Sequence, residues 1–191
     1  MTKIKLALFA SGNGSNALAI IRHFQNHPKV DIAFLLSNKE DAPIVSKAEN
    51  LGVKVVILTN EEAANEVLLL NLVDDAKVDY IILAGYLRKI PVELTNSYPN
   101  KIFNIHPSLL PKHGGKGMYG KFVHEKVIEN KETESGVTIH FVNEHFDEGK
   151  HIAQFYCSVS PEDTSTTLQA KVNKLELDYF PIVIEKTIFA S

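Results

Sequence analysis

The sequence predicts an α/β fold in which a mostly parallel sheet carries helices on both faces and ends in an antiparallel pair of strands. Short apolar runs alternate with helix-like patterns up to residue 105, as is typical of a parallel sheet covered on both sides. Two β-rich runs nearer the C-terminus are joined by a segment too short for a crossover helix. The 191 residues fall within the usual size of one domain. We therefore expect a single Rossmann-like domain over residues 1–191.

The first half of the chain supplies the parallel part of the expected sheet, with strands at residues 3–10, 30–36, 54–58, 80–84 and 102–105. A glycine-rich turn at 11–16 leads into a first helix, whose Leu18, Ile21 and Phe24 share one side at helical spacing. Two further helices are expected at 43–51, where Gly52 ends the pattern, and at 61–75. Strand, glycine turn and helix together form the opening of an α/β unit.

The second half supplies different elements. Residues 136–142 and 151–159 are rich in β-forming side chains, and we expect them to pair antiparallel at the edge of the sheet. A helix should follow over about 165–177, and Pro181 should kink or end it because proline lacks the N–H that a helix needs. Residues 113–120 contain four glycines, which predicts a mobile loop over the site.

Composition excludes several classes of function. The net charge of −3 without a basic tract argues against binding to nucleic acid or to a membrane surface. The single cysteine, Cys157, rules out an internal disulfide and fits a reducing compartment. The first apolar run is too short for a signal peptide or a membrane span, so we expect a cytoplasmic protein with small-molecule partners.

Asn104 and His106 stand at the end of an apolar run, in the stretch Asn-Ile-His-Pro-Ser-Leu-Leu-Pro at 104–111. Side chains two residues apart in a strand point to the same face, so an amide donor and an imidazole can address one atom. The two prolines restrict the backbone behind them, which suits a site that holds a developing negative charge. The alternative is that both side chains close a strand and bond to nearby backbone.

The turn at residues 11–16 lies where an α/β sheet offers backbone N–H groups and a helix N-terminus to an anion, for which phosphate is the natural ligand. The same turn matches a relaxed dinucleotide fingerprint, but Ser37-Asn38-Lys39 stands where that fingerprint expects an acidic residue. It is not a Walker loop, because no Gly-Lys-Ser/Thr follows. A turn that needs glycine only for its backbone angles is the alternative.

Asp147 lies between the two late strands, and His140 lies on the strand that leads to it. Either side chain could converge with His106, and a carboxylate near an imidazole raises its proton affinity and orients it. Together with Glu144 and His145 these residues raise the alternative of a metal-dependent hydrolase. Neither an HExxH motif nor a cysteine pair is present, so we expect no metal.

Four motifs together resemble the folate-dependent formyltransferase family: SGNGSN at 11–16, LAGYLRKIP at 83–91, FNIHPSLLPKHGGKG at 103–117 and SGVTIHFVNEHFDEG at 135–149. The likeness runs over about residues 3–184 and is nearest to the phosphoribosylglycinamide formyltransferase branch. Methionyl-tRNA formyltransferase resembles this core but has an extra C-terminal domain, and formyltetrahydrofolate deformylase has an extra regulatory domain. We expect neither extra domain here.

The resemblance implies the formyltransferase fold and transfer of the formyl group of 10-formyltetrahydrofolate to the amine of glycinamide ribonucleotide, without a metal, by a monomer or homodimer. It implies a catalytic trio of Asn104, His106 and Asp147. The implied substrate-binding residues are Gly14, Ser15 and Asn16 for the phosphate, Glu176 for the ribose, and Leu87, Arg88, Lys89, Ile90, Asn104, His140, Asn143, Glu144 and Asp147 for the folate.

Two departures from the family pattern concern the folate tail and the loop. Residues 61–73 contain no basic side chain where family members carry an arginine, and His113-Gly114-Gly115 follows Lys112 where some members have Pro-Gly. Hydrolysis of the same formyl donor, and a non-catalytic phosphate-binding module, stay open as alternative functions. For Glu176 the alternative is an exposed helix carboxylate that pairs with Lys174 or with solvent.

Overall fold

The computed structural model describes residues 2–190. The chain divides into two compact units, Met1–Phe103 and Asn104–Ser191. The boundary falls inside strand β5 (Ile102–His106), directly before Asn104. The expectation of one domain over the whole chain stays a prediction.

The first unit is built on a parallel sheet. Its strands are β1 (Ile4–Phe9), β2 (Val30–Ser37), β3 (Val55–Ile57) and β4 (Tyr80–Leu83), in the order β3-β2-β1-β4. β1 pairs in parallel with both β2 and β4. Side chains of β1 such as Leu6, Leu8 and Phe9 are fully buried, as expected for a strand covered on both faces.

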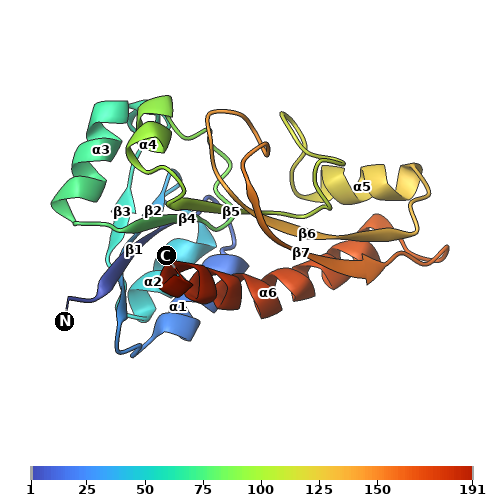
Figure 1. The fold of residues 1–191 in the computed structure, drawn as a ribbon, viewed down its shortest axis with the longest axis horizontal. Helices are drawn as coiled ribbons and strands as arrows, with labels where there is room; N and C mark the ends of the chain where they lie inside the picture. The colour runs from blue at the N-terminus through green and yellow to red at the C-terminus, as the bar shows by residue number, and fades with distance from the viewer. Residues whose placement is uncertain (1, 191) are drawn as a thin grey trace. The chain divides into compact units, whose positions relative to one another are not determined.

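Helices cover both faces of this sheet, as Figure 1 shows for α1 (Ser15–Phe24) and α2 (Pro43–Asn50) on one side and α3 (Glu66–Asp75) and α4 (Val92–Ser97) on the other. The segment expected as one helix at 61–75 is divided, because Asn65 caps α3 by accepting a hydrogen bond from Leu68 N at 3.0 Å. A short 3₁₀ helix, Glu62–Ala64, precedes it. The six-residue α4 was not predicted from the sequence.

The second unit contains the antiparallel pair. β6 (Glu134–Phe141) and β7 (His151–Ser158) pair antiparallel, with Val137 opposite Phe155, so this part of the fold prediction is confirmed. α5 (Lys121–Glu129), which the sequence did not predict, precedes the pair, and α6 (Ser165–Ala190) packs against both strands (Figure 1). The rings of Phe155 and Tyr179 stack between β7 and α6 with centroids 3.8 Å apart.

The helix expected at about 165–177 is longer in the structure, because α6 continues through Pro181 to Ala190. Of the two effects expected of Pro181, an end to the helix is therefore wrong. Pro181 cannot donate the hydrogen bond of a helix interior. Phe180 and Ile184, on either side of it, are fully buried, and this burial outweighs the missing bond because tertiary packing routinely overrides helix propensity. Within residues 2–190, no helix is both long and apolar enough to cross a membrane.

Candidate active site

The turn between β1 and α1 presents the start of a helix to any anion that approaches it. Gly14 precedes α1 at φ 70°, no side chain caps the helix, and its first turn carries no acidic residue. The N–H groups of the first turn therefore have no capping acceptor from a side chain, which is the arrangement that binds phosphate. An ideal Cβ on Gly14 would overlap the side chain of Ile44, so glycine is required at this position by packing as well as by backbone angle.

A cation lies on the same turn. Lys47 of α2 donates from Nζ to Asn13 Oδ1 at 2.6 Å and to Asn13 O at 3.2 Å. Sequence reasoning missed this residue because it lies 34 positions from Asn13 and no motif joins the two. The turn thus combines backbone N–H groups with one ammonium group, both of which favour an anion.

Ser11 connects the turn to the segment at 87–90. Its Oγ donates to Asn38 Oδ1 at 2.6 Å and accepts from Leu87 N at 3.1 Å. Asn38 stands near the position where a dinucleotide fingerprint expects an acid, and here its amide oxygen is used by Ser11. This hydrogen bonding fixes the two loops of the first unit relative to each other without an acidic side chain.

The four residues at 87–90 differ in exposure. Leu87 is 59% exposed, whereas Ile90 is 4% exposed and belongs to the core. Arg88 donates from Nη2 to Asn60 O at 3.3 Å. Leu87 therefore offers apolar surface to a ligand, while Ile90 supports the segment from within.

The second unit brings Asn104, His106, His140 and Asp147 together. His106 Nδ1 lies 3.4 Å from Asp147 Oδ2, and His140 Nε2 lies 3.6 Å from Asp147 Oδ1. Asn104 donates from Nδ2 to His140 Nε2 at 3.1 Å. His140 Nδ1–H in turn donates to Phe141 O at 2.8 Å, which fixes the tautomer of this ring. Three of these side chains come from the ends of β5 and β6, and Asp147 comes from the connection between β6 and β7.

Opposing influences set the protonation of the pair at the centre of this cluster. Burial lowers the pKa of His106 below its ordinary value, although the charge of Asp147 acts in the opposite direction. Burial by itself would raise the pKa of Asp147, but the approach of His140, His106 and the Gly115 N–H outweighs it and holds that pKa below its usual range. Asp147 is therefore present as a carboxylate, and the protonated ring of His106 readily loses one of its two ring protons.

The loop after His106 supplies backbone groups to this pair, a contribution the sequence could not indicate. His106 Nε2–H donates to His113 O at 2.8 Å, and Gly115 N donates to Asp147 Oδ2 at 2.9 Å. Backbone groups are present at every residue, so no residue type marks these two. The loop that was expected to cover the site is in direct contact with its residues.

A buried hydroxyl supports the turn that follows β5. Thr138 Oγ1 donates to Ser108 O at 2.7 Å and accepts from Leu110 N at 2.9 Å. Gln154 Nε2 donates to Leu110 O at 2.9 Å. These bonds from β6 and β7 hold residues 108–110, and with them the end of β5 that carries Asn104 and His106.

Three other residues expected at the site differ in their surroundings. Glu144 is exposed and pairs with His145 at 3.3 Å, and Asn143 Oδ1 accepts from His145 N at 3.0 Å. Glu176 on α6 is buried, at 8% exposure. The alternative of an exposed Glu176 carboxylate is therefore wrong. Lys174, two residues earlier, pairs with Asp178 at 2.6 Å. Among residues 2–190 no group of three or more His, Cys, Asp or Glu side chains is arranged to hold a metal ion.

Comparison with known proteins identifies the family. A profile described as "Formyl transferase" matches residues 4–184. The chain belongs to the formyl transferase family. The resemblance inferred from the four sequence motifs is therefore confirmed.

Relatives within the formyl transferase family match nearly the whole chain. The phosphoribosylglycinamide formyltransferase of Bacillus subtilis is 33% identical over 96% of this chain and 94% of its own length. The chloroplastic phosphoribosylglycinamide formyltransferase of Vigna unguiculata is 40% identical over 95% of this chain, which spans only 60% of that protein. The crystal structure of the Brucella melitensis phosphoribosylglycinamide formyltransferase matches with a TM-score of 0.87 at 33% identity, covering 97% of this chain and 96% of that one.

Proposed function

We propose that this formyl transferase moves the formyl group of 10-formyltetrahydrofolate to the amine of glycinamide ribonucleotide, a step of purine nucleotide biosynthesis. The observation that carries the proposal is the convergence of His106 and Asp147, 3.4 Å apart, beside Asn104 in a chain of this family. An amide donor, an imidazole and a carboxylate are the groups that transfer of a formyl group to an amine requires. Relatives that match nearly the whole chain carry the name phosphoribosylglycinamide formyltransferase, which supports the choice of acceptor.

Asn104 stabilises the tetrahedral intermediate in this proposal. Attack of the amine on the formyl carbon turns the formyl oxygen into an alkoxide. The Asn104 amide has two N–H groups, and the hydrogen bond to His140 uses one of them, so the other is available to the alkoxide. One such donor typically contributes about 3 kcal/mol to the transition state.

His106 and Asp147 handle the proton. Because Nε2–H is bound to His113 O, Nδ1 is the nitrogen that gains or loses a proton beside Asp147. When protonated, Nδ1–H donates to the alkoxide and Asp147 stabilises the ring. The attacking nitrogen loses its proton to Asp147, directly or through water. Asp147 then returns this proton to the folate nitrogen as the alkoxide collapses to a carbonyl and the bond from that nitrogen to the formyl carbon breaks.

Substrate binding is assigned to the remaining residues. Backbone N–H groups of Gly14, Ser15 and Asn16 hold the nucleotide phosphate, with the Lys47 ammonium adding charge. Glu176 accepts hydrogen bonds from the ribose hydroxyls. The folate-binding residues are those expected from the family: Leu87, Arg88, Lys89, Ile90, His140, Asn143 and Glu144 together with Asn104 and Asp147.

The reaction needs no metal, because the amide and imidazole supply the stabilisation that a Lewis acid would otherwise supply. We infer a cytoplasmic monomer or homodimer acting on small molecules. The name of the Vigna unguiculata relative gives a chloroplast location for that protein, so an organelle is the alternative compartment.

A transfer assay with the purified chain tests the proposal. Incubation with 10-formyltetrahydrofolate and glycinamide ribonucleotide should give formylated ribonucleotide and tetrahydrofolate in equal amounts, and tetrahydrofolate should not form when the ribonucleotide is omitted. Formate release without the ribonucleotide would indicate a hydrolase. Binding of the ribonucleotide without turnover, unchanged by loss of His106, would indicate a non-catalytic phosphate-binding module.

A further inference from the structure

The orientation of the His106 ring depends on the backbone of the loop that follows it. The carbonyl of His113 can only accept a hydrogen bond, so the 2.8 Å contact with His106 Nε2 places a proton on that nitrogen. Nδ1 is left to face Asp147 at 3.4 Å. The position of one carbonyl oxygen therefore decides which nitrogen of His106 can exchange a proton.

His113 holds that carbonyl in a backbone conformation which residues other than glycine rarely adopt. Its φ is +54°, and such a conformation persists only where the surrounding structure holds it. The preceding residue is fixed on both sides, because Ser108 Oγ donates to Lys112 O at 2.6 Å and Lys112 N donates to Leu109 O at 3.1 Å. His113 itself is held through its side chain, which is 10% exposed.

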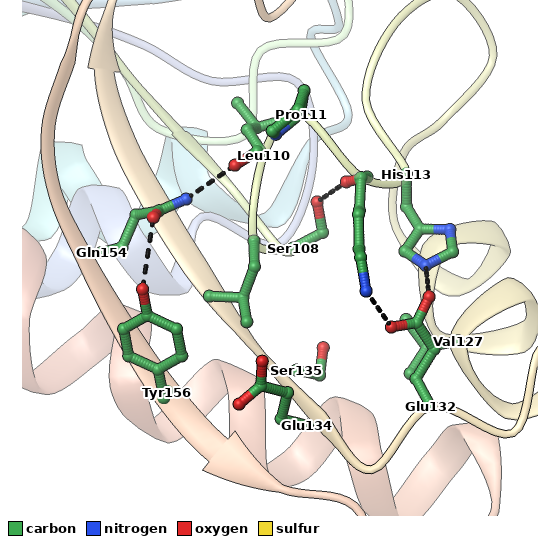
Figure 2. A pocket seen from close by; sticks show the side chains of 12 residues that line it. Ser108, Leu110, Pro111, His113, Val127, Glu132, Glu134, Ser135, Gln154 and Tyr156 are labelled. Atoms are coloured by element: carbon green, nitrogen blue, oxygen red, sulfur yellow. Dashed lines mark hydrogen bonds and ion pairs between the residues drawn. The ribbon is translucent and has the colours of Figure 1, made fainter.

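The partner of the His113 side chain is Glu132. His113 Nε2–H donates to Glu132 Oε1 at 2.9 Å, and Lys112 Nζ donates to Glu132 Oε2 at 2.8 Å. Figure 2 shows Glu132 facing His113 at the wall of a cavity of about 240 Å³. The hydrogen bond from Lys112 lowers the pKa of Glu132, with a further contribution from His113, so the carboxylate stays ionised at neutral pH.

Glu132 is fixed independently of the loop that it holds. Its backbone N–H donates to Val127 O at 3.2 Å, at the end of α5, and β6 begins two residues later at Glu134. The Lys112 side chain is 63% exposed, and exposed ion pairs contribute little to stability. The bond to His113 is therefore the contact of Glu132 that reaches the catalytic cluster.

We propose that Glu132 is a positioning residue for formyl transfer: through the His113 side chain it places the His113 carbonyl, and so fixes the tautomer and orientation of His106. This inference rests on the proposed function and adds a residue that does not touch the reacting atoms. Glu132 acts on the proton-transfer step and not on the binding of either substrate.

Kinetics on four variants test the effect on turnover. Glu132→Ala should lower kcat at least about tenfold and leave both KM values within about twofold. Glu132→Gln, which keeps an acceptor for His113, should lose less than Glu132→Ala. The matched control is Glu134→Ala, which removes a carboxylate that lines the same cavity, and it should retain full turnover. His113→Asn tolerates the positive φ but shortens the side chain, and it should lower kcat as Glu132→Ala does.

A double variant tests whether Glu132 acts through His113. Adding Glu132→Ala to His113→Asn should cause no further loss of kcat, because the path between the two residues is already broken. Additive losses would overturn the proposal. Equal losses of kcat in Glu132→Ala and Glu134→Ala would also overturn it. They would indicate that turnover depends on the negative charge of the cavity and not on the bond between Glu132 and His113.

A spectroscopic measurement separates this inference from the proposed function, because it needs no turnover. Nitrogen NMR of the histidine rings, with the His106 signals assigned from a His106→Gln spectrum, should show a single Nε2–H tautomer in the unsubstituted protein. Glu132→Ala should give a mixture of tautomers, and Glu134→Ala should not. An unchanged His106 signal in folded Glu132→Ala would refute the inference, whereas absence of transfer by the unsubstituted protein would refute the proposed function alone.

Discussion

Substitution of Gly12 and of Gly14 separates the packing of the turn at residues 11–16 from the phosphate binding that we propose for it. Gly14→Ala places a Cβ at φ 70° against the side chain of Ile44. The left-handed backbone costs about 1–2 kcal/mol for a residue other than glycine, and overpacking adds about 1–3 kcal/mol. The free energy of unfolding should therefore fall by roughly 2–5 kcal/mol. A Cβ on Gly12 meets nothing within 4 Å, so Gly12→Ala should change stability by less than about 0.5 kcal/mol.

Thermal unfolding and calorimetry with glycinamide ribonucleotide measure the two effects. Gly14→Ala should lower Tm by roughly 4–20 °C, since 1 kcal/mol corresponds to about 2–4 °C for a chain of this size. Gly12→Ala should keep the Tm, and a loss of affinity of at least about fivefold would indicate that the phosphate occupies the open space beside Gly12. Equal Tm values for the two variants would refute the packing argument, and unchanged affinity in Gly12→Ala would refute a phosphate position beside Gly12.

Three further predictions concern the second unit. Asn104→Ala, His106→Ala and Asp147→Asn should each reduce turnover by about two orders of magnitude or more while the fold is kept, and near-normal turnover in His106→Ala would disprove the mechanism. Burial lowers the pKa of His124 to about 4, so the unfolded chain binds more protons below about pH 6.5 and stability should fall by up to about 3 kcal/mol as the pH drops to about 4. Denaturant unfolding at several pH values should show this loss reduced in His124→Gln. Glu176→Ala should raise KM for the ribonucleotide at least about tenfold and leave the Kd of a folate analogue unchanged; an equal weakening of both ligands would indicate an effect on the fold.

Periodicity and turn residues were sufficient to predict the parallel sheet and the antiparallel pair. The buried run of β1 and the short connection between β6 and β7 are local features of the sequence, and local features predict elements well. α6 was predicted too short because the rule for Pro181 is local, whereas the burial of Phe180 and Ile184 depends on the folded chain. The division of residues 61–75 depended on one side-chain cap at Asn65.

The candidate site was predictable where side-chain chemistry marks it. The spacing of Asn104 and His106 indicated a shared target, and the position of Asp147 after β6 made its approach to them plausible. Contacts that depend on folding were not predictable. Every residue has a backbone carbonyl, so the sequence does not distinguish that of His113, and Glu132 lies 19 positions from His113 along the chain. The sequence therefore indicated which side chains the fold brings together but not what holds them in place.

The close approach at Gly149 limits how the segment that carries Asp147 can vary among related sequences. A Cβ at Gly149 would overlap the carbonyl of Phe141, so any other residue would force apart the two strands where the hairpin begins. Glu144 and His145 in the middle of the connection are exposed and carry no such restriction. The connection between β6 and β7 is therefore restricted at Gly149, close to Asp147, whereas its exposed centre can accept other side chains.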